Sequence, residues 1–265
     1  MESPWLHRYA VLLAVCTLLL VVTGASFASN EERPLYSLGR GHPVEGMLVG
    51  ILTIGLAIWM SLVENPAWLR RLAWLALAAV ILEGVLGLPA DPVSPASLSH
   101  TFLAHLFFSI TVAIAVFTSG GWQLSPERVE DRGRPSLRSL AIATPAVVLA
   151  QVALGAAYRH EAVGLMPHVA GAMIVALLIL VVGVFVTQQF PGHRSLRPAA
   201  IALMTIAFLQ VFLGITIITI EALNLENALP LILSTVAHVV TGALTMAATV
   251  VLAILIRRNV RARPE

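Results

Sequence analysis

Long apolar runs alternate with short polar or turn-forming stretches along the whole chain. Each run has about twenty residues, the length that a helix needs to cross the hydrocarbon core of a bilayer. Eight such runs are predicted, at 9–28, 43–63, 70–88, 98–118, 138–157, 167–187, 196–219 and 231–256. An even number of crossings returns both ends of the chain to one side of the membrane.

The composition agrees with this pattern. Of the 265 residues, 58% are hydrophobic and only 11% are charged, and the mean hydropathy is +0.89. So few polar groups cannot cover a water-soluble surface of this size, and we expect an all-α integral membrane protein in a lipid bilayer. Run 9–28 has the length of a retained helix and seven similar runs follow it, which disfavours a cleaved signal peptide. Cys16 is the only cysteine, so no internal disulfide and no thiolate metal cluster is expected.

All sixteen basic residues are arginines, and their placement predicts the orientation in the membrane. Thirteen fall in the loops of one side: Arg8, Arg70, Arg71, Arg128, Arg132, Arg134, Arg138, Arg194, Arg197, Arg257, Arg258, Arg261 and Arg263. The other side holds Arg33, Arg40 and Arg159. Because cytoplasmic loops are enriched in arginine, we expect a multi-pass protein of the inner (cytoplasmic) membrane with both termini in the cytoplasm. Arginines spread over loops in this way do not form a nucleic-acid patch.

The stretch 119–138 is the only long charged linker, and it divides the chain into two halves. We expect an N-terminal four-helix half at 1–122, a cytoplasmic linker at 123–137 and a C-terminal four-helix half at 138–265. A five-residue phrase that ends in glycine recurs in the first, third, fifth and seventh runs, at Leu20-Val-Val-Thr-Gly24, Glu83-Gly-Val-Leu-Gly87, Gln151-Val-Ala-Leu-Gly155 and Gln210-Val-Phe-Leu-Gly214. This internal repeat predicts two pseudo-symmetric four-helix bundles.

A histidine lies near the start of each of the other four runs, at equivalent depth toward the outer face. These histidines are His42, His100, His168 and His238. An imidazole in lipid has a hydrogen-bond donor and an acceptor that both need partners. A histidine in a membrane helix is therefore a candidate functional residue by default. Because a haem iron takes two axial ligands from opposite faces, we predict two bis-histidine haem sites, one formed by His42 and His100 and one by His168 and His238.

A small residue follows each of these histidines at the fourth position: Gly46, Ala104, Ala172 and Gly242. Residues i and i+4 share a helix face, so a bulky side chain there would obstruct a porphyrin, and we assign these four positions to cofactor binding. Close packing of helices also favours small residues, and hydrogen bonds between helices are the alternative role for the histidines. Zinc or a di-iron centre would need acids or thiolates gathered around one site, which the sequence does not place together.

Four further residues are candidates for chemistry. Glu45 lies one turn after His42 and is the candidate acid–base group, with a hydrogen bond to a neighbouring helix as the alternative. Arg159 suits a haem propionate, because guanidinium binds carboxylates bidentately, although a solvated loop end fits it equally. His105 points about 140° away from His100 on an ideal helix and is not its partner. The roles of His105 and of the neighbouring His160 stay open.

The chain resembles the heme A synthase family over nearly its whole length. The residues that carry this resemblance are His42 with Leu48-Val-Gly50, His100 with Phe107-Phe-Ser109, Gln151-Val-Ala-Leu-Gly155 leading to Arg159-His160, His168, Gln210-Val-Phe-Leu-Gly214, and His238 with Gly242. The resemblance implies an oxidoreductase that converts the methyl group of haem o to the formyl group of haem a for terminal oxidases. His168 and His238 would hold a haem b cofactor, and His42 and His100 would face the substrate haem.

The resemblance also implies partners, and the chain departs from the family at two places. Haem o synthase and terminal oxidase assembly factors are the implied partners, a homo-oligomer is compatible with the family, and the electron acceptor is not encoded in this sequence. Many members have two cysteines in the first outer loop, whereas 29–41 has none, and a glutamate one turn before the first histidine, where this chain has Gly39. A non-catalytic bis-haem electron-transfer or haem-carrier protein is therefore the alternative, and a transporter with histidine proton relays is a third.

Overall fold

The computed structural model describes residues 4–28, 41–63, 66–88, 94–225 and 229–261, and these are almost entirely helical. Eight long helices are present in this part of the chain: α1 (Pro4–Ala28), α3 (His42–Leu62), α4 (Ala67–Leu86), α5 (Pro95–Phe117), α7 (Leu137–Arg159), α8 (Leu165–Gln189), α9 (Leu196–Ala222) and α10 (Leu229–Asn259). Seven of them are long and apolar enough to cross a membrane. The exception is α4, which contains Arg70, Arg71 and Glu83. The fold is that of an all-α, multi-pass membrane protein.

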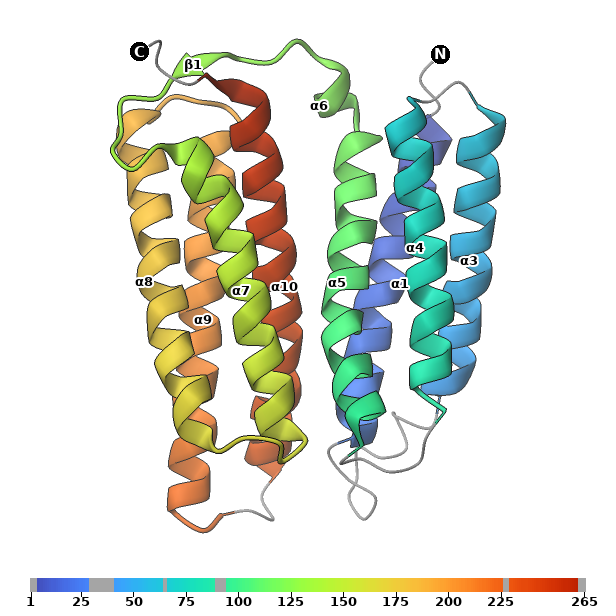
Figure 1. Ribbon diagram of the computed structural model, residues 1–265, viewed down its shortest axis with the longest axis vertical. Helices are drawn as coiled ribbons and strands as arrows, with labels where there is room; N and C mark the ends of the chain where they lie inside the picture. The colour runs from blue at the N-terminus through green and yellow to red at the C-terminus, as the bar shows by residue number, and fades with distance from the viewer. Residues whose placement is uncertain (1–3, 29–40, 64–65, 89–93, 226–228, 262–265) are drawn as a thin grey trace.

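The long helices form two groups of four that stand side by side (Figure 1). In the first group α1, α3, α4 and α5 contact one another in a ring, and in the second α7, α8, α9 and α10 do the same. Helices α1 and α5 pack against α10, and α5 also packs against α7. The beginning of α1 and the end of α10 lie at the same end of the molecule (Figure 1).

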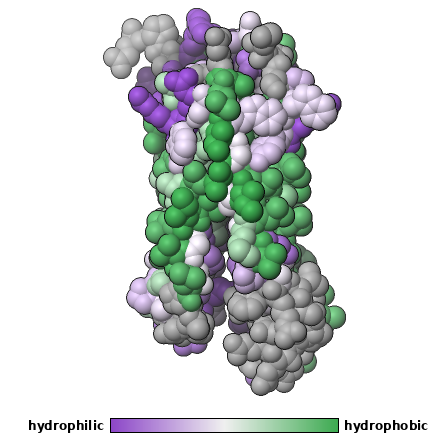
Figure 2. Space-filling model, turned by 90° about the vertical axis from the view of Figure 1, so that its right-hand side faces the viewer, coloured by the Kyte–Doolittle hydropathy of each residue, from purple (hydrophilic) through white to green (hydrophobic). Residues whose placement is uncertain are grey.

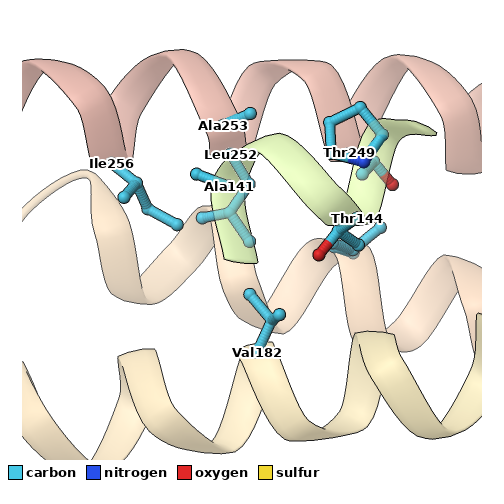
Figure 3. A pocket seen from close by; sticks show the side chains of 9 residues that line it. Ala141, Thr144, Val182, Thr249, Leu252, Ala253 and Ile256 are labelled. Carbon is cyan, nitrogen blue, oxygen red and sulfur yellow. The ribbon is translucent and has the colours of Figure 1, made fainter. Parts of the chain in front are cut away.

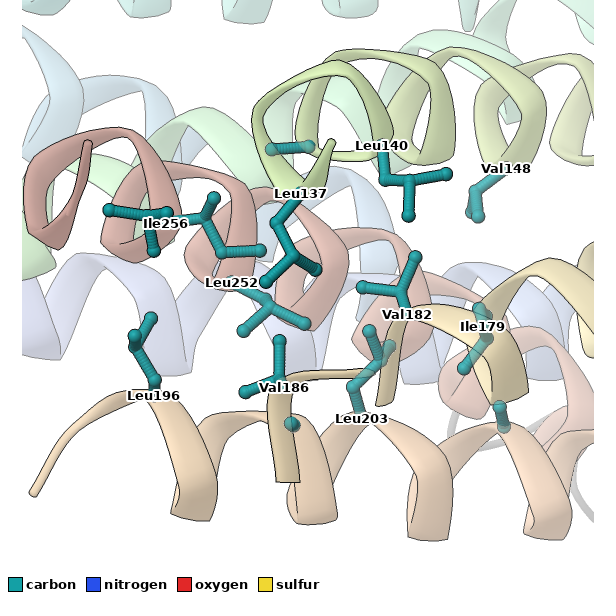
Figure 4. Packing of buried hydrophobic residues seen from close by; sticks show 14 of the residues in the cluster. Leu137, Leu140, Val148, Ile179, Val182, Val186, Leu196, Leu203, Leu252 and Ile256 are labelled. Carbon is teal, nitrogen blue, oxygen red and sulfur yellow. The ribbon is translucent and has the colours of Figure 1, made fainter. Parts of the chain in front are cut away.

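Each group has its own apolar core. Figure 4 shows the core of the second group, in which Leu137, Val186, Leu203 and Ile256 from four different helices meet. The first group is centred on Leu13, Leu56, Ala76 and Ile114, again one from each helix. A third, smaller cluster joins the groups, with Val21 of α1, Phe108 of α5 and Ala243 and Ala247 of α10.

The outer surface is apolar along the middle of the helices. Figure 2 shows hydrophobic side chains covering the centre of one face, with hydrophilic side chains gathered toward the ends. Helix α9 is the most exposed, and its large residues Phe208, Phe212 and Ile215 are all more than half exposed. Lipid tails can solvate such a surface, whereas water cannot, so the apolar belt agrees with a bilayer environment.

The connection between the groups is ordered and docked on the end of α10. It contains the short helix α6 (Gly120–Gln123) and strand β1 (Val129–Glu130), which pairs in parallel with β2 (Val260–Arg261) directly after α10. The Arg258 guanidinium lies 4.2 Å from the Trp122 ring centroid and donates hydrogen bonds to the carbonyls of Gly121, Trp122 and Leu124. The linker predicted at 123–137 thus has structure of its own.

Candidate functional site

The four predicted ligand histidines lie toward one end of the molecule, opposite the beginning of α1 and the end of α10. Helices α3, α5, α8 and α10 all run from this end toward the other (Figure 1). His42 is the first residue of α3 and His168 is in the first turn of α8, whereas His238 is nine residues into α10 because that helix begins at Leu229. All four are partly exposed. Two helices of each group therefore bring one histidine each toward this end of the molecule.

The structure brings the histidines together in two pairs. The ring centroids of His42 and His100 are 6.2 Å apart with ring planes at 87°, and those of His168 and His238 are 6.3 Å apart at 78°. Two imidazoles that bind one metal ion from opposite sides have centroids roughly 6 Å apart, because a metal–nitrogen bond is about 2 Å long. The donor set of each pair and its spacing therefore fit the two axial ligands of a haem iron.

Around His42 a chain of hydrogen bonds runs from α3 to α1 and back. The Nδ1 atom of His42 is 3.3 Å from the Thr23 hydroxyl, and that hydroxyl donates to Glu45 Oε2 at 2.6 Å. Thr23 has one proton, so when it donates to Glu45 its oxygen can accept from Nδ1–H. The proton then sits on Nδ1 and Nε2 is left with a free lone pair, as a metal ligand requires.

His100 is held by α4. Its Nδ1 lies 2.7 Å from Glu83 Oε2 and 3.1 Å from the Glu83 backbone carbonyl oxygen. Glu83 is 8% exposed, and its other carboxylate oxygen is buried and has no hydrogen-bond partner among the residues that the structure describes. Both acceptors near Nδ1 favour the tautomer that leaves Nε2 available, as for His42.

The second pair is held by two glutamines. His238 Nδ1 donates to the backbone carbonyl of Gln210 at 3.1 Å, and the Gln210 amide nitrogen is 3.2 Å from its Nε2. The Gln210 amide oxygen in turn accepts from Thr241. The Gln151 amide nitrogen is 3.0 Å from His168 Nδ1, and the His168 ring stacks on another α7 residue, Tyr158, with centroids 6.1 Å apart at 11°.

The four small residues predicted at the cofactor are all partly exposed, but their surroundings differ. Among the described residues, nothing lies within 4 Å of a Cβ built on Gly46, so this part of the chain leaves open space next to it on α3. A Cβ on Gly242 would lie 3.3 Å from the Gln210 amide nitrogen and 3.7 Å from His105 Nε2. In the described part of the chain, Gly46 thus borders free space one turn after His42. Gly242, in contrast, faces side chains of α9 and α5, which pack against α10. Ala104 and Ala172 are half-buried. Their contact with a cofactor stays a prediction.

The remaining candidates lie where the two groups meet. The Arg159 guanidinium reaches the Ala25 carbonyl of α1 at 3.5 Å, and His160 Nε2 is 2.9 Å from the Thr101 hydroxyl of α5. His105 is 6% exposed and its Nδ1 donates to the Thr101 backbone carbonyl at 2.8 Å. None of these residues belongs to either histidine pair. His160 joins α5 to the second group through Thr101, and His105 does so through a hydrogen bond with the Val239 backbone of α10.

Sequence reasoning missed several residues that hold the histidines. Thr23 and Tyr158 carried no signal beyond their position in or near the glycine-ending phrase. The glycines of that phrase were noticed only as a repeat, yet each packs against a histidine ring. Gly39 and the predicted cysteine-free loop lie outside the described residues, as do Arg33, Arg40 and Arg263.

The described part of the chain offers no competing centre near the histidines. A cavity of about 10 Å³ lies in the second group between Thr144, Val182 and Thr249 (Figure 3). It is at most large enough for one water molecule. Thr249 is eleven residues beyond His238 on α10, which is roughly 16 Å along a helix. Among the described residues no group of three or more histidine, cysteine, aspartate or glutamate side chains is arranged to hold a metal ion.

Comparisons with known proteins add no relative. The chain matches no protein-family model and no curated protein sequence.

Proposed function

We propose that this protein binds two haems in the membrane, one between His42 and His100 and one between His168 and His238. The observation that carries the proposal is the pair of facing imidazoles in each helix group, with centroids 6.2 Å and 6.3 Å apart. A zinc site would need further nitrogen, sulfur or oxygen ligands, whereas haem iron needs only two axial ones. Open space beside Gly46 also suits a flat ligand next to His42.

The proposed architecture has eight spanning helices in two pseudo-symmetric bundles. Helix α4 is counted as the eighth, because a 20-residue helix is long enough and Arg70 and Arg71 in its first turns can reach the interface. The side rich in arginine is the cytoplasmic one, so both termini are cytoplasmic and the histidines lie toward the periplasmic side of the inner membrane.

The proposed activity is oxidation of haem o to haem a, as in the heme A synthase family. The haem b held by His168 and His238 would supply electron transfer, and His42 and His100 would hold the substrate haem. The reaction consumes one water, converts the methyl group to a formyl group and releases four protons and four electrons to an acceptor outside this chain. Glu45 is the proposed acid–base group, and haem o synthase and oxidase assembly factors are the proposed partners.

A second candidate is a bis-haem electron-transfer or haem-carrier protein without the oxidation step. The hydrogen bond between Thr23 and Glu45 favours it, because that contact gives Glu45 a structural role on the Nδ1 side of His42, away from the ligand atom Nε2. The two candidates share both haem sites and differ in whether the haem of the first pair is exchanged and modified.

One experiment separates these possibilities. The protein is expressed in cells that supply haem b and haem o, purified in detergent, and its pigments are extracted and identified together with its absorption spectrum. For the proposed activity we expect haem b plus hydroxylated or formyl product. Retention of two unmodified haems would support the second candidate, and a pigment-free, folded protein would overturn the haem proposal.

Single variants test the division of labour between the pairs. His168→Ala or His238→Ala should remove haem b, while His42→Ala or His100→Ala should remove only the substrate haem. His7→Ala is the matched control, because His7 lies on α1 at the opposite end and contacts Ala115 and Thr118. Equal loss of haem in all four variants would show that the assignment of cofactor and substrate sites is wrong.

A further inference from the structure

Each of the four histidines rests on a glycine of a neighbouring helix. A Cβ built on Gly24 would lie 2.7 Å from Cε1 of His42, and one on Gly87 would lie 3.2 Å from Cε1 of His100. The corresponding distances are 3.0 Å from Gly155 to His168 and 3.2 Å from Gly214 to His238. Carbon atoms in van der Waals contact lie about 3.5–4.0 Å apart, so none of these places accepts even a methyl group without movement.

These glycines are the last residues of the recurring five-residue phrase. Its first residue is four positions earlier and thus one helical turn away on the same face. In two cases the backbone carbonyl of that first residue accepts from the histidine Nδ1, at 3.1 Å for Glu83 with His100 and 3.1 Å for Gln210 with His238. The Leu20 backbone contacts His42 in the same way. His168 differs, because the Gln151 amide nitrogen lies 3.0 Å from its Nδ1 and can only donate, so Nδ1 is the acceptor there.

We propose that the first and last residues of this phrase form a histidine seat, which positions each ligand histidine for iron. The four seats are Leu20 with Gly24, Glu83 with Gly87, Gln151 with Gly155 and Gln210 with Gly214. The inference rests on the proposed haem sites and names the residues that set their geometry. The first residue of a seat fixes the Nδ1 side of the ring, and the glycine lets the Cε1 edge lie against the helix backbone. Together they fix the position of each ring relative to the histidine of the facing helix, 6.2 Å or 6.3 Å away between centroids.

Little displacement is tolerable in such a site. The centroid separations of 6.2 Å and 6.3 Å leave room for two bonds of about 2 Å each and no more. A methyl group on the seat glycine would push the ring toward the facing histidine or tilt it, and one of the two iron bonds would lengthen or break. The histidine would stay in place as a residue but fail as an axial ligand.

The test replaces the seat glycines by alanine in the full-length protein and titrates it with iron protoporphyrin IX in detergent. Glycines that border open space in neighbouring positions serve as matched controls: Gly84→Ala on α4, three residues before Gly87, and Gly50→Ala on α3. Alanine in a helix is favoured over glycine by about 1 kcal/mol, so neither control should lose stability.

We expect the seat variants to bind haem 10- to 100-fold more weakly at the affected pair, the usual effect of disturbing groups that orient metal ligands. The absorption spectrum of that pair should change from six-coordinate low-spin to five-coordinate high-spin. The loss of haem affinity should be larger where the built Cβ lies closer to the histidine Cε1. Gly24→Ala should therefore lose the most affinity, and Gly87→Ala and Gly214→Ala the least. The controls should bind like the unaltered protein.

Added free imidazole shows whether a seat variant has lost the position of one axial ligand or has misfolded. In a correctly folded seat variant, imidazole can occupy the lost axial position and restore the low-spin spectrum, whereas an unfolded variant gains nothing. If the unaltered protein binds haem and all four seat variants bind it equally well with low-spin spectra, the seat inference is overturned and the haem proposal stands. If the unaltered protein binds no haem, both fall.

Discussion

For three of the four histidines, the tautomer is set by the groups on the Nδ1 side of the ring. Thr23, the Glu83 carboxylate and the Gln210 carbonyl each offer an oxygen to that nitrogen, although they come from three different helices. A histidine whose Nδ1–H is hydrogen-bonded presents Nε2 in one orientation, which is how proteins orient imidazole ligands. At residue scale the site is thus defined as much by its acceptors as by its histidines.

Thr23→Val tests whether the Thr23 hydroxyl orients His42. Valine has nearly the same shape, so the packing of α1 is kept, but His42 loses an acceptor and Glu45 loses its donor. We expect about 10- to 100-fold weaker haem binding at the first pair and no change at the second. Titration with haem followed by absorption spectroscopy measures this.

Thr17→Val is its control, because the Thr17 hydroxyl on the same helix donates only to the Leu13 carbonyl. Equal haem affinities of the two valine variants would mean that Thr23 does not orient His42.

The candidate residues could be predicted from the sequence, but their contacts could not. The four histidines stand out because polar rings are costly in apolar runs. The repeated phrase also has Glu83, Gln151 and Gln210, which can form hydrogen bonds, at its first position. Which histidine each would contact depends on how helices are ordered in the bundle, and a repeat does not contain that order. The glycine contacts were hidden for the same reason.

At the scale of elements, apolar runs located the helices but not their ends. The runs predicted at 9–28 and 231–256 are helices over Pro4–Ala28 and Leu229–Asn259. Hydrophobicity marks the part of a helix within lipid, whereas backbone hydrogen bonds continue into the interface. The start of α7 is fixed by a polar side chain, which hydropathy does not detect. Asp131 in the linker accepts from the Leu137 amide at 2.6 Å and from the Gly133 amide at 2.9 Å.

Asp131→Ala should therefore loosen the start of α7 and the linker. Asp131 is 4% exposed, and its loss would leave two backbone amides without their acceptor, at a cost of about 1–3 kcal/mol each when buried. We expect a lower midpoint of thermal unfolding in detergent, with haem binding unchanged. Glu130→Ala, at the adjacent exposed position, is the control. Indistinguishable midpoints for the two variants would contradict a role for Asp131 in holding this junction.

At the scale of the molecule, the two helix groups are joined by polar contacts as well as by packing. His160 with Thr101 and Arg159 with the Ala25 carbonyl cross between the groups near the histidine pairs. The apolar cluster around Phe108 and Ala243, which also joins the groups, is smaller than the core of either group. The sequence predicted two halves from the linker and the repeat, but nothing in it placed α1 and α5 against α10, because helices in lipid lack an apolar face that must be hidden from water.

The orientation proposed for this assembly rests on its arginines and can be tested with single cysteines. In a Cys16→Ser background, Gln123→Cys places a thiol in the exposed linker and Ala162→Cys places one in the exposed turn after α7. These positions lie at opposite ends of the molecule (Figure 1). By the arginine distribution, a membrane-impermeant maleimide should label position 162 in right-side-out vesicles and position 123 only in inverted vesicles. The reverse pattern would put the histidine pairs on the cytoplasmic side, and labelling of both positions from one side would rule out a membrane-spanning arrangement of α7, the one long helix between them.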